Sequence, residues 1–156
     1  MIKQNDLQRL VRQSAMVRRH AYAPYSKFRV GAAVQAESGQ IYCGTNVENV
    51  CFPAGTCAER SAVSAAVAAG EIHIVAVAVA SAGGVTPCGV CRQVLLEFGT
   101  GMTVLCVDTD KIRIDALLDE SQSPDLYHAV VGQYCLTDLL PSAFDDFEGE
   151  GIAPGR

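Results

Sequence analysis

Two short cysteine-containing segments place the strongest constraint on how this chain folds. The first is Cys57-Ala58-Glu59, and the second, further along, is Pro87-Cys88-Gly89-Val90-Cys91. Three thiolates can hold one zinc ion and leave its fourth position open to water, whereas a structural zinc site is closed by four protein ligands. A carboxylate beside an open site suits hydrolysis, which requires proton transfer. The sequence therefore predicts a hydrolytic metal site with Glu59 next to the three thiols.

Both cysteine segments lie at the predicted start of a helix. Residues 57–69 are rich in alanine, follow Thr56 and stop at Gly70, which gives this helix a start and an end signal. A later helix is expected to be capped by Thr86, with Pro87 in its first turn and Gly99 at its end. The two helix starts would direct partial positive charge at the thiolates, and Arg60 would offset more of their negative charge.

The other apolar patterns predict an α/β fold. They indicate a first helix after a cap at Asn5, a β-hairpin, and two buried strands that are apolar on both faces. The corresponding ranges are 5–21 for the helix, 28–35 and 41–44 for the hairpin, and 72–80 and 102–107 for the buried strands. The segment 112–118 fits either a strand or a short helix, and the pattern of 127–133 favours neither. This order predicts a mixed sheet sandwiched between helices.

Length and charge limit the class of protein. The 156 residues fit one domain, which we expect to span 1–144, followed by an acidic tail at 145–156 that we expect to be disordered. A net charge of -5 argues against a nucleic-acid binder, because such proteins carry basic patches. No uninterrupted apolar segment indicates a secretory signal or a membrane span. These features predict a cytoplasmic protein that acts on a small molecule.

The chain has seven cysteines, an odd count that argues against a disulfide framework. Cys43, Cys51, Cys106 and Cys135 are expected to be simply buried, because a free cysteine packs as a small hydrophobic residue. The remaining cysteines, Cys57, Cys88 and Cys91, are the candidates for binding a metal ion.

Each cysteine segment also has an alternative interpretation when it is taken alone. Cys88-Gly89-Val90-Cys91 is typical of a dithiol oxidoreductase, and Thr56-Cys57-Ala58-Glu59 is a capping box in which Glu59 only holds the helix end. A zinc-stabilised binding module without chemistry would require a fourth ligand. The coincidence of the two segments in one chain favours the catalytic site over any of these.

The joint pattern resembles the zinc-dependent nucleoside and nucleobase deaminases, and most closely the small cytidine deaminases. The similarity extends over about residues 5 to 144. The segments that carry it are Ala23-Pro24-Tyr25-Ser26-Lys27-Phe28-Arg29-Val30-Gly31-Ala32-Ala33, Asn46-Val47-Glu48-Asn49, Thr56-Cys57-Ala58-Glu59-Arg60 and Leu139-Leu140-Pro141-Ser142-Ala143-Phe144. The resemblance implies a three-layer α/β/α sandwich with a mixed sheet of about five strands.

The resemblance also implies a role for individual residues. Cys57, Cys88 and Cys91 would bind one Zn²⁺ per subunit, and Glu59 would shuttle protons. Asn46 and Glu48 would bind the ribose hydroxyls. The other expected substrate contacts are Phe28 beside the pyrimidine, Ala58, and the aromatic residues Phe52 and Phe144, the last of which would reach into a neighbour's site.

The implied reaction is the hydrolytic deamination of cytidine and deoxycytidine to uridine and deoxyuridine, as in pyrimidine salvage. The expected assembly is a homotetramer with its sites near the subunit interfaces, without nucleic-acid or membrane partners. Within the same chemistry, a cytosine-nucleoside antibiotic such as blasticidin S is an alternative substrate. In another class, a dithiol oxidoreductase based on Cys88 and Cys91 is the alternative.

Overall fold

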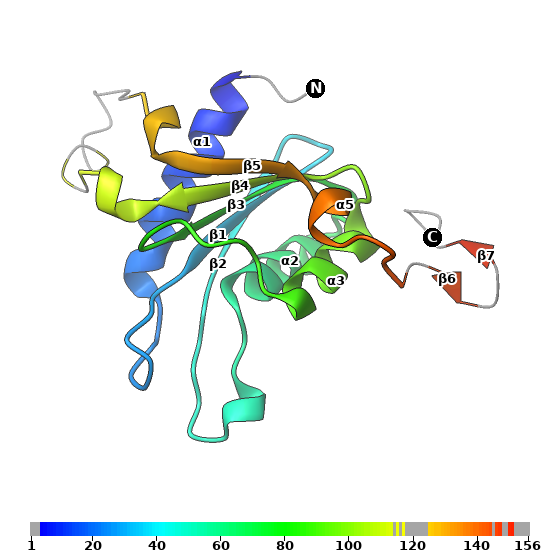
Figure 1. Cartoon of the computed structure of the whole chain (residues 1–156), viewed down its shortest axis with the longest axis horizontal. Helices are drawn as coiled ribbons and strands as arrows, with labels where there is room; N and C mark the ends of the chain where they lie inside the picture. The colour runs from blue at the N-terminus through cyan, green and yellow to red at the C-terminus, as the bar shows by residue number, and fades with distance from the viewer. Residues whose placement is uncertain are drawn as a thin grey trace.

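The computed structural model describes residues 4–113, 115, 117, 125–144, 146–147 and 150–151. Five strands form one sheet in the order β2-β1-β3-β4-β5, in which β3 and β4 are parallel and the other neighbours are antiparallel (Figure 1). The strands are β1 (Gly31–Ala36), β2 (Ile41–Thr45), β3 (Ile74–Ser81), β4 (Thr103–Asp108) and β5 (Val130–Cys135). The predicted mixed, five-stranded sheet is confirmed.

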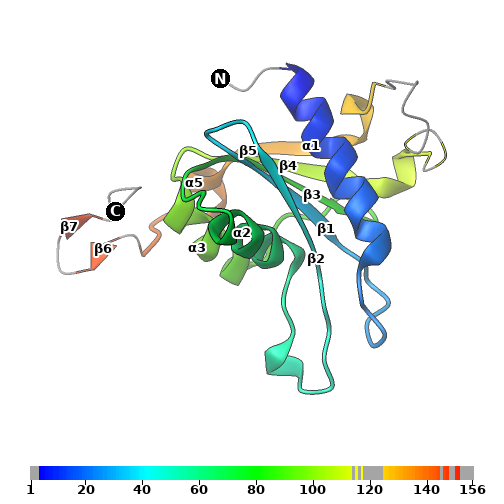
Figure 2. The same cartoon turned by 180° about the vertical axis from the view of Figure 1, so that it is seen from behind.

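Helices cover both faces of this sheet (Figure 2). Helix α1 (Gln4–Val17) lies on one face, and α2 (Ala58–Ala68) and α3 (Gly89–Phe98) lie on the other. Shorter helical segments are η1 (Arg18–His20), η2 (Phe52–Ala54), η3 (Thr109–Lys111), η4 (Tyr127–Ala129) and α5 (Leu136–Leu139). The result is the expected three-layer α/β/α sandwich.

The central strand β3 separates two apolar cores. Ala76, Ala78 and Ala80 pack on the side of α1, whereas Val77 and Val79 pack on the side of α2 and α3. Successive side chains of a strand point to opposite faces, so a strand covered on both sides must be apolar throughout. This explains the unbroken apolar run that predicted a buried strand.

Two glycines in the hairpin allow helices to approach it closely. A Cβ atom on Gly31 would lie 2.2 Å from the backbone oxygen of Ser14 in α1. A Cβ atom on Gly44 would lie 2.3 Å from the backbone nitrogen of Ala62 in α2. Because α2 begins directly after Cys57, the contact at Gly44 sets how deep this end of the helix sits against the sheet.

The predicted helices are present, but their boundaries differ. Helix α1 ends at Val17 and continues as the 3₁₀ turn η1, and Asn5 lies inside the helix rather than at its cap. The cap residues of α2 and α3 are Cys57 and Cys88, instead of Thr56 and Thr86, and neither forms a side-chain capping hydrogen bond. The thiols are therefore left available for other partners.

The segments that the sequence pattern left open are now partly assigned. Strand β5 occupies most of 127–133 and pairs with β4. Asp115 and Leu117 are helical, which agrees with the helix alternative for 112–118. Within the tail, β6 (Asp146–Phe147) pairs with β7 (Glu150–Gly151). The other residues of the tail predicted to be disordered lie outside the described residues, so that expectation stays a prediction.

All seven cysteines lie in the described part of the chain and are free thiols. Cys106 is buried as expected, but Cys43 and Cys135 are only partly buried and Cys51 is exposed. The expectation of simple burial is therefore wrong for Cys51, which lies in the segment that extends beyond the sheet between β2 and α2 (Figure 1). No helix within the described ranges is long and apolar enough to cross a bilayer.

Candidate active site and metal centre

Three thiols from two helix starts converge at one point. Cys57 precedes α2, Cys88 precedes α3, and Cys91 lies in the first turn of α3. Their sulfur atoms lie within 4.8 Å of one another, and the Sγ atoms of Cys57 and Cys88 are 3.9 Å apart. A tetrahedral zinc with Zn–S bonds of about 2.3 Å separates its sulfurs by about 3.8 Å. The cluster therefore fits a zinc ion, and no other such group occurs among the residues described.

The backbone at the two helix starts explains this convergence. Cys57 and Cys88 are both extended, with ψ of 157° and 164°, and each is followed immediately by helical residues. The first N–H groups of a helix have no partner within it and carry partial positive charge. Thiolates at these positions are consequently stabilised by the backbone of both helices.

Without a metal ion, the three thiols share their protons unevenly. A hydrogen bond from Cys91 lowers the pKa of Cys57 to about 5, and Cys88 and the guanidinium of Arg60 contribute in the same direction. The same Cys57–Cys91 hydrogen bond, together with burial, raises the pKa of Cys91. A metal ion that binds all three as thiolates must displace the remaining protons, so its affinity rises with pH.

Glu59 lies beside the thiols in the first turn of α2 and is only 4% exposed. Burial raises its pKa, and the negative charge of Cys57 adds to this shift. A carboxyl group that is readily protonated can both accept a proton and return it. Because α2 begins at Ala58, Glu59 is not in the position that a capping box requires, and the capping alternative is not supported.

Arg60 is held between the thiol cluster and the preceding loop. Its Nη2 donates a hydrogen bond of 3.1 Å to the carbonyl oxygen of Gly55. Its Nε is buried and has no hydrogen-bond partner among the described residues. The guanidinium interacts with the thiol of Cys57 and lowers its pKa, and the expected role of Arg60 in offsetting the charge of the sulfur cluster stays a prediction.

The two residues expected to bind ribose both contact the loop that leads into β1. Asn46 accepts a hydrogen bond from the backbone nitrogen of Val30 and donates one to the carbonyl oxygen of Phe28, each at 2.8 Å. Glu48 accepts from the backbone nitrogens of Tyr25 and Ser26, at 2.8 and 3.2 Å. Asn46 and Glu48 are two residues apart in sequence, and both side chains therefore contact the same segment, residues 25–30.

This segment is also connected to the metal cluster. Val47, which lies between Asn46 and Glu48, forms a β-bridge with Thr56 on one side and with Tyr22 on the other. Thr56 directly precedes Cys57. Asn46 and Glu48 therefore lie beside Thr56, the residue that precedes the first thiol, Cys57.

The remaining expected contacts lie at the surface, with one exception. Phe28, Phe52 and Phe144 are 40%, 73% and 66% exposed. Phe52 packs edge-to-face against Tyr25, with ring centroids 5.6 Å apart. Ala58 is fully buried at the first position of α2, so a contact with substrate would involve its backbone.

A pocket of about 420 Å³ lies beside these aromatic rings. Its lining residues are Tyr25, Ser26, Glu48, Asn49, Phe52 and Gly55. The volume falls within the usual range for sites that hold small molecules. The pocket includes Glu48 and Phe52 from the expected set, but not Phe28, Asn46 or the thiols.

The sequence from residue 4 to 107 matches the family described as cytidine and deoxycytidylate deaminase zinc-binding region. The chain belongs to this family. The matched region contains the three thiols and Glu59, and the thiol cluster has the dimensions of a zinc site. Zinc is therefore the cofactor of this deaminase family member.

Several cytidine deaminases are similar to this family member over most of its length. The enzyme from Mycobacterium tuberculosis is 46% identical over 134 residues, which cover 83% of this chain and 84% of that protein. The one from Halalkalibacterium halodurans is 35% identical over 141 residues, covering 89% and 94%. A crystal structure of cytidine deaminase from Burkholderia pseudomallei superposes with a TM-score of 0.73 at 33% identity, covering 92% of this chain and all of that one.

One residue that organises the deaminase site was missed by the sequence analysis. The guanidinium of Arg92 donates to the carbonyl oxygens of Pro87 and Leu139, both at 2.8 Å, and to the hydroxyl of Thr86 at 3.0 Å. It therefore holds the residues before Cys88 and ties them to α5. In the sequence, only its position directly after Cys91 draws attention to Arg92. An arginine at that position could equally be an exposed helix residue without contacts.

The neighbouring Gln93 holds the C-terminal segment to the same helix. Its Nε2 donates a hydrogen bond of 2.7 Å to the carbonyl oxygen of Phe144. Consecutive residues of α3 thus fix both ends of the segment from Leu139 to Phe144, which places Phe144 relative to the helix that carries Cys91.

Proposed function

We propose that the chain catalyses the hydrolytic deamination of cytidine and deoxycytidine to uridine and deoxyuridine, with release of ammonia. The observation that carries this proposal is the cluster of three thiols with the buried carboxyl group of Glu59 beside it. Three protein ligands leave one position of a tetrahedral metal for water. The names of the similar proteins supply the substrate, since those cited above are called cytidine deaminase.

Glu59 would perform the proton transfers of this reaction. Bound zinc would supply the charge that activates a water molecule for attack on C4 of cytosine. Glu59 takes one proton from that water and gives it to N3, and then moves the second proton to the exocyclic amine, which leaves as ammonia. The burial that raises its pKa favours the protonated form needed for the second half of this cycle.

The metal would be held by Cys57, Cys88 and Cys91, with one Zn²⁺ per subunit. Their sulfur separations support this assignment. Arg60 would offset part of the charge of three thiolates. The largest cause that lowers the pKa of Cys57 is the hydrogen bond from Cys91, and the guanidinium of Arg60 lowers it further.

Asn46 and Glu48 would bind the ribose hydroxyls, Phe28 would pack beside the pyrimidine, and the backbone of Ala58 would contact the base. Both polar side chains keep capacity for a ligand. The amide nitrogen of Asn46 has a second N–H beyond the one donated to Phe28, and a carboxylate offers about four acceptor positions, of which Glu48 uses three.

The functional unit would be a cytoplasmic homotetramer built from a catalytic domain of residues 1–144. The exposure of Phe52 and Phe144 supports this assembly, because large aromatic side chains at the surface favour burial against another subunit. In such an assembly the two rings would complete a neighbour's site. The acidic net charge supports a free nucleoside, rather than a nucleic acid, as the partner.

The position of Cys57 weighs against the oxidoreductase alternative. A dithiol couple needs Cys88 and Cys91 alone, whereas Cys57 contributes a third thiol at 3.9 Å from Cys88. No contact in the described residues favours an antibiotic over a nucleoside, so that substrate serves as a comparison in the assay.

Ultraviolet absorbance during incubation with cytidine tests the proposal. We expect the zinc-loaded protein to convert cytidine to uridine, and we expect removal of zinc by a chelator to abolish turnover until zinc is restored. The control is the same chelator saturated with zinc before addition, which should have no effect. Turnover that persists in protein shown to be free of metal would contradict the proposed chemistry.

A further inference from the structure

One serine connects two residues that the proposed function assigns to different parts of the substrate. The hydroxyl of Ser26 donates a hydrogen bond to the carboxylate of Glu48 and accepts one, at 3.0 Å, from the backbone nitrogen of Phe28. A hydroxyl has one donor and two acceptor positions, so it makes both contacts at once. Ser26 thus joins the residue expected to bind ribose to the residue expected to pack on the base.

The turn around Ser26 needs such support. Lys27 lies in the left-handed region with φ of 60°, a conformation that residues other than glycine seldom adopt. It sits between Ser26 and Phe28, so the direction in which the chain reaches Phe28 depends on this turn. The turn is held by the backbone nitrogens of Tyr25 and Ser26, which donate to the Glu48 carboxylate, and by the backbone nitrogen of Phe28, which donates to the Ser26 hydroxyl.

We propose that Ser26 is a positioning residue that makes the Glu48 carboxylate and the Phe28 ring one preorganised unit, and so sets the preference for ligands that carry ribose hydroxyls. This inference rests on the proposed function, which assigns Glu48 to the ribose and Phe28 to the base. Ser26 contacts neither Glu59 nor the thiols through any hydrogen bond of the described residues. Its effect is therefore on substrate binding rather than on the chemical step.

The charge state of Glu48 supports this role. The hydrogen bond from Ser26 is the largest cause that lowers the pKa of Glu48, and the backbone nitrogens of Tyr25 and Ser26 add to it. These hydrogen bonds favour the ionised carboxylate, in which both oxygens are acceptors for sugar hydroxyls. Loss of the Ser26 hydroxyl would move the pKa of Glu48 upward and free its carboxylate to rotate.

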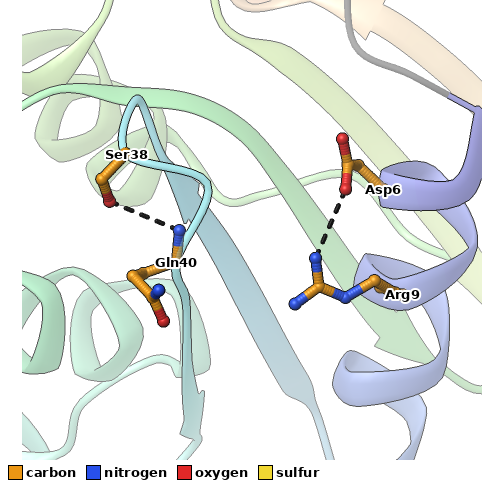
Figure 3. Close-up of polar contacts among 4 residues, drawn as sticks. All are labelled: Asp6, Arg9, Ser38 and Gln40. Carbon is orange, nitrogen blue, oxygen red and sulfur yellow. Dashed lines mark hydrogen bonds and ion pairs between the residues drawn. The ribbon is translucent and has the colours of Figure 1, made fainter.

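Ser38 offers a matched control within the same chain. Its hydroxyl accepts a hydrogen bond of 3.3 Å from the backbone nitrogen of Gln40, two residues later (Figure 3). It also donates a hydrogen bond to the carboxylate of Glu71. This is the arrangement of Ser26, Phe28 and Glu48. Ser38 lies in the turn between β1 and β2, at the opposite end of the hairpin from Ser26.

The first test compares two substrates with the zinc-loaded enzyme. We expect Ser26→Ala to raise KM for cytidine about tenfold while kcat stays within about twofold, because one charge-assisted hydrogen bond is lost from the binding site. For 2′,3′-dideoxycytidine, which lacks the 2′- and 3′-hydroxyls but keeps the base, KM should rise by a clearly smaller factor, because only the support of Phe28 is lost. Ser26→Thr, which keeps a hydroxyl, should retain the wild-type preference for cytidine over 2′,3′-dideoxycytidine. Ser38→Ala should have the wild-type KM for both substrates. An equal change for the two substrates, or a fall in kcat at unchanged KM, would overturn the proposal.

The second test needs no turnover. Titration of ¹³C-labelled glutamate carboxyl groups by NMR should show the pKa of Glu48 moving upward in Ser26→Ala and staying in place in Ser38→Ala. An unchanged Glu48 pKa in Ser26→Ala would overturn the link between the two residues. A wild-type protein that fails to deaminate cytidine would instead refute the proposed function, which this titration does not measure.

Discussion

At the scale of single residues, the site depends on a carboxyl group in an environment that opposes its charge. Glu59 is almost fully buried and lies beside Cys57, whose pKa is low, so its own pKa is raised by burial and by this neighbour. A surface glutamate, with its ordinary pKa, would be a weaker base toward water and would seldom carry the proton that it has to donate. The position at the start of α2 thus suits Glu59 to both of the proton transfers proposed for it.

We expect Glu59→Gln to lower kcat for cytidine about a thousandfold while zinc binding stays stoichiometric, because the amide keeps the shape but cannot transfer protons. Steady-state kinetics and metal analysis of the purified variant measure the two quantities. Cys88→Ala is the informative counterpart, since loss of a ligand should release zinc and activity together. Near-normal turnover in Glu59→Gln, or full zinc content in Cys88→Ala, would show that these assignments are wrong.

At the scale of secondary-structure elements, close packing of helices on the hairpin determines where the thiols meet. Helix α2 lies against Gly44, and its first residues carry the site. The start of α3 is held by Arg92, which joins Pro87 to α5. The positions of the sulfurs are therefore consequences of the packing of whole elements.

Gly44→Ala tests this dependence. The new Cβ would meet the backbone of Ala58 and Ala62 at 2.6 and 2.3 Å, so α2 must shift outward. We expect a loss of about 1–3 kcal/mol in the free energy of unfolding and weaker zinc binding, measured by denaturant unfolding and by competition with a chelator. Gly101→Ala, whose added methyl meets nothing within 4 Å, is the control. If Gly44→Ala is destabilised but binds zinc as tightly as the wild type, the packing of α2 against Gly44 does not determine the geometry of the zinc site.

Elements with strong local patterns could be predicted from the sequence, and those defined by distant contacts could not. The buried strand β3 and the alanine-rich α2 follow from apolar periodicity and end signals. Strand β5 was not assigned, because its burial alternates irregularly at the sheet edge and its pairing partner β4 is distant in sequence. The helix caps were also predicted one or two residues too early, because the hydroxyls of Thr56 and Thr86 cap neither helix, and α2 and α3 begin after Cys57 and Cys88.

The same division applies to the site. The spacing of Cys57, Cys88 and Cys91 predicted a cluster that the structure brings together. Arg92 binds the carbonyl oxygen of Leu139 in α5, and Ser26 binds the carboxylate of Glu48, so both contacts join residues far apart in sequence and no residue pattern indicates them. Residue types chosen for their chemistry are visible in a sequence, whereas residues that position others through backbone contacts are not.

At the scale of the whole molecule, exposed apolar side chains gather on the segments next to the site. Phe52 and Val50 are 73% and 80% exposed, and Tyr22 and Tyr25 on the neighbouring loop are 57% and 49% exposed. Val47 bridges the two segments, so these residues belong to one region of the surface. Exposed apolar side chains that lie together are typical of surfaces that another protein chain covers. It provides the physical basis for the proposed tetramer.

We expect the wild-type protein to sediment with four times the 16.5 kDa mass of the chain. Phe52→Ala should shift the distribution toward smaller species, because it removes a large apolar side chain from the centre of this surface. Ile72→Ala is the control, since Ile72 is also exposed but precedes β3, at the end of that strand opposite the loop to Cys88. Activity measured on the separated species adds a second readout: if neighbouring subunits complete each site, the smaller species should keep zinc and lose turnover. A wild-type protein that sediments with the mass of one chain would contradict the proposed tetramer. A smaller species with full activity would show that no neighbouring subunit contributes to the active site.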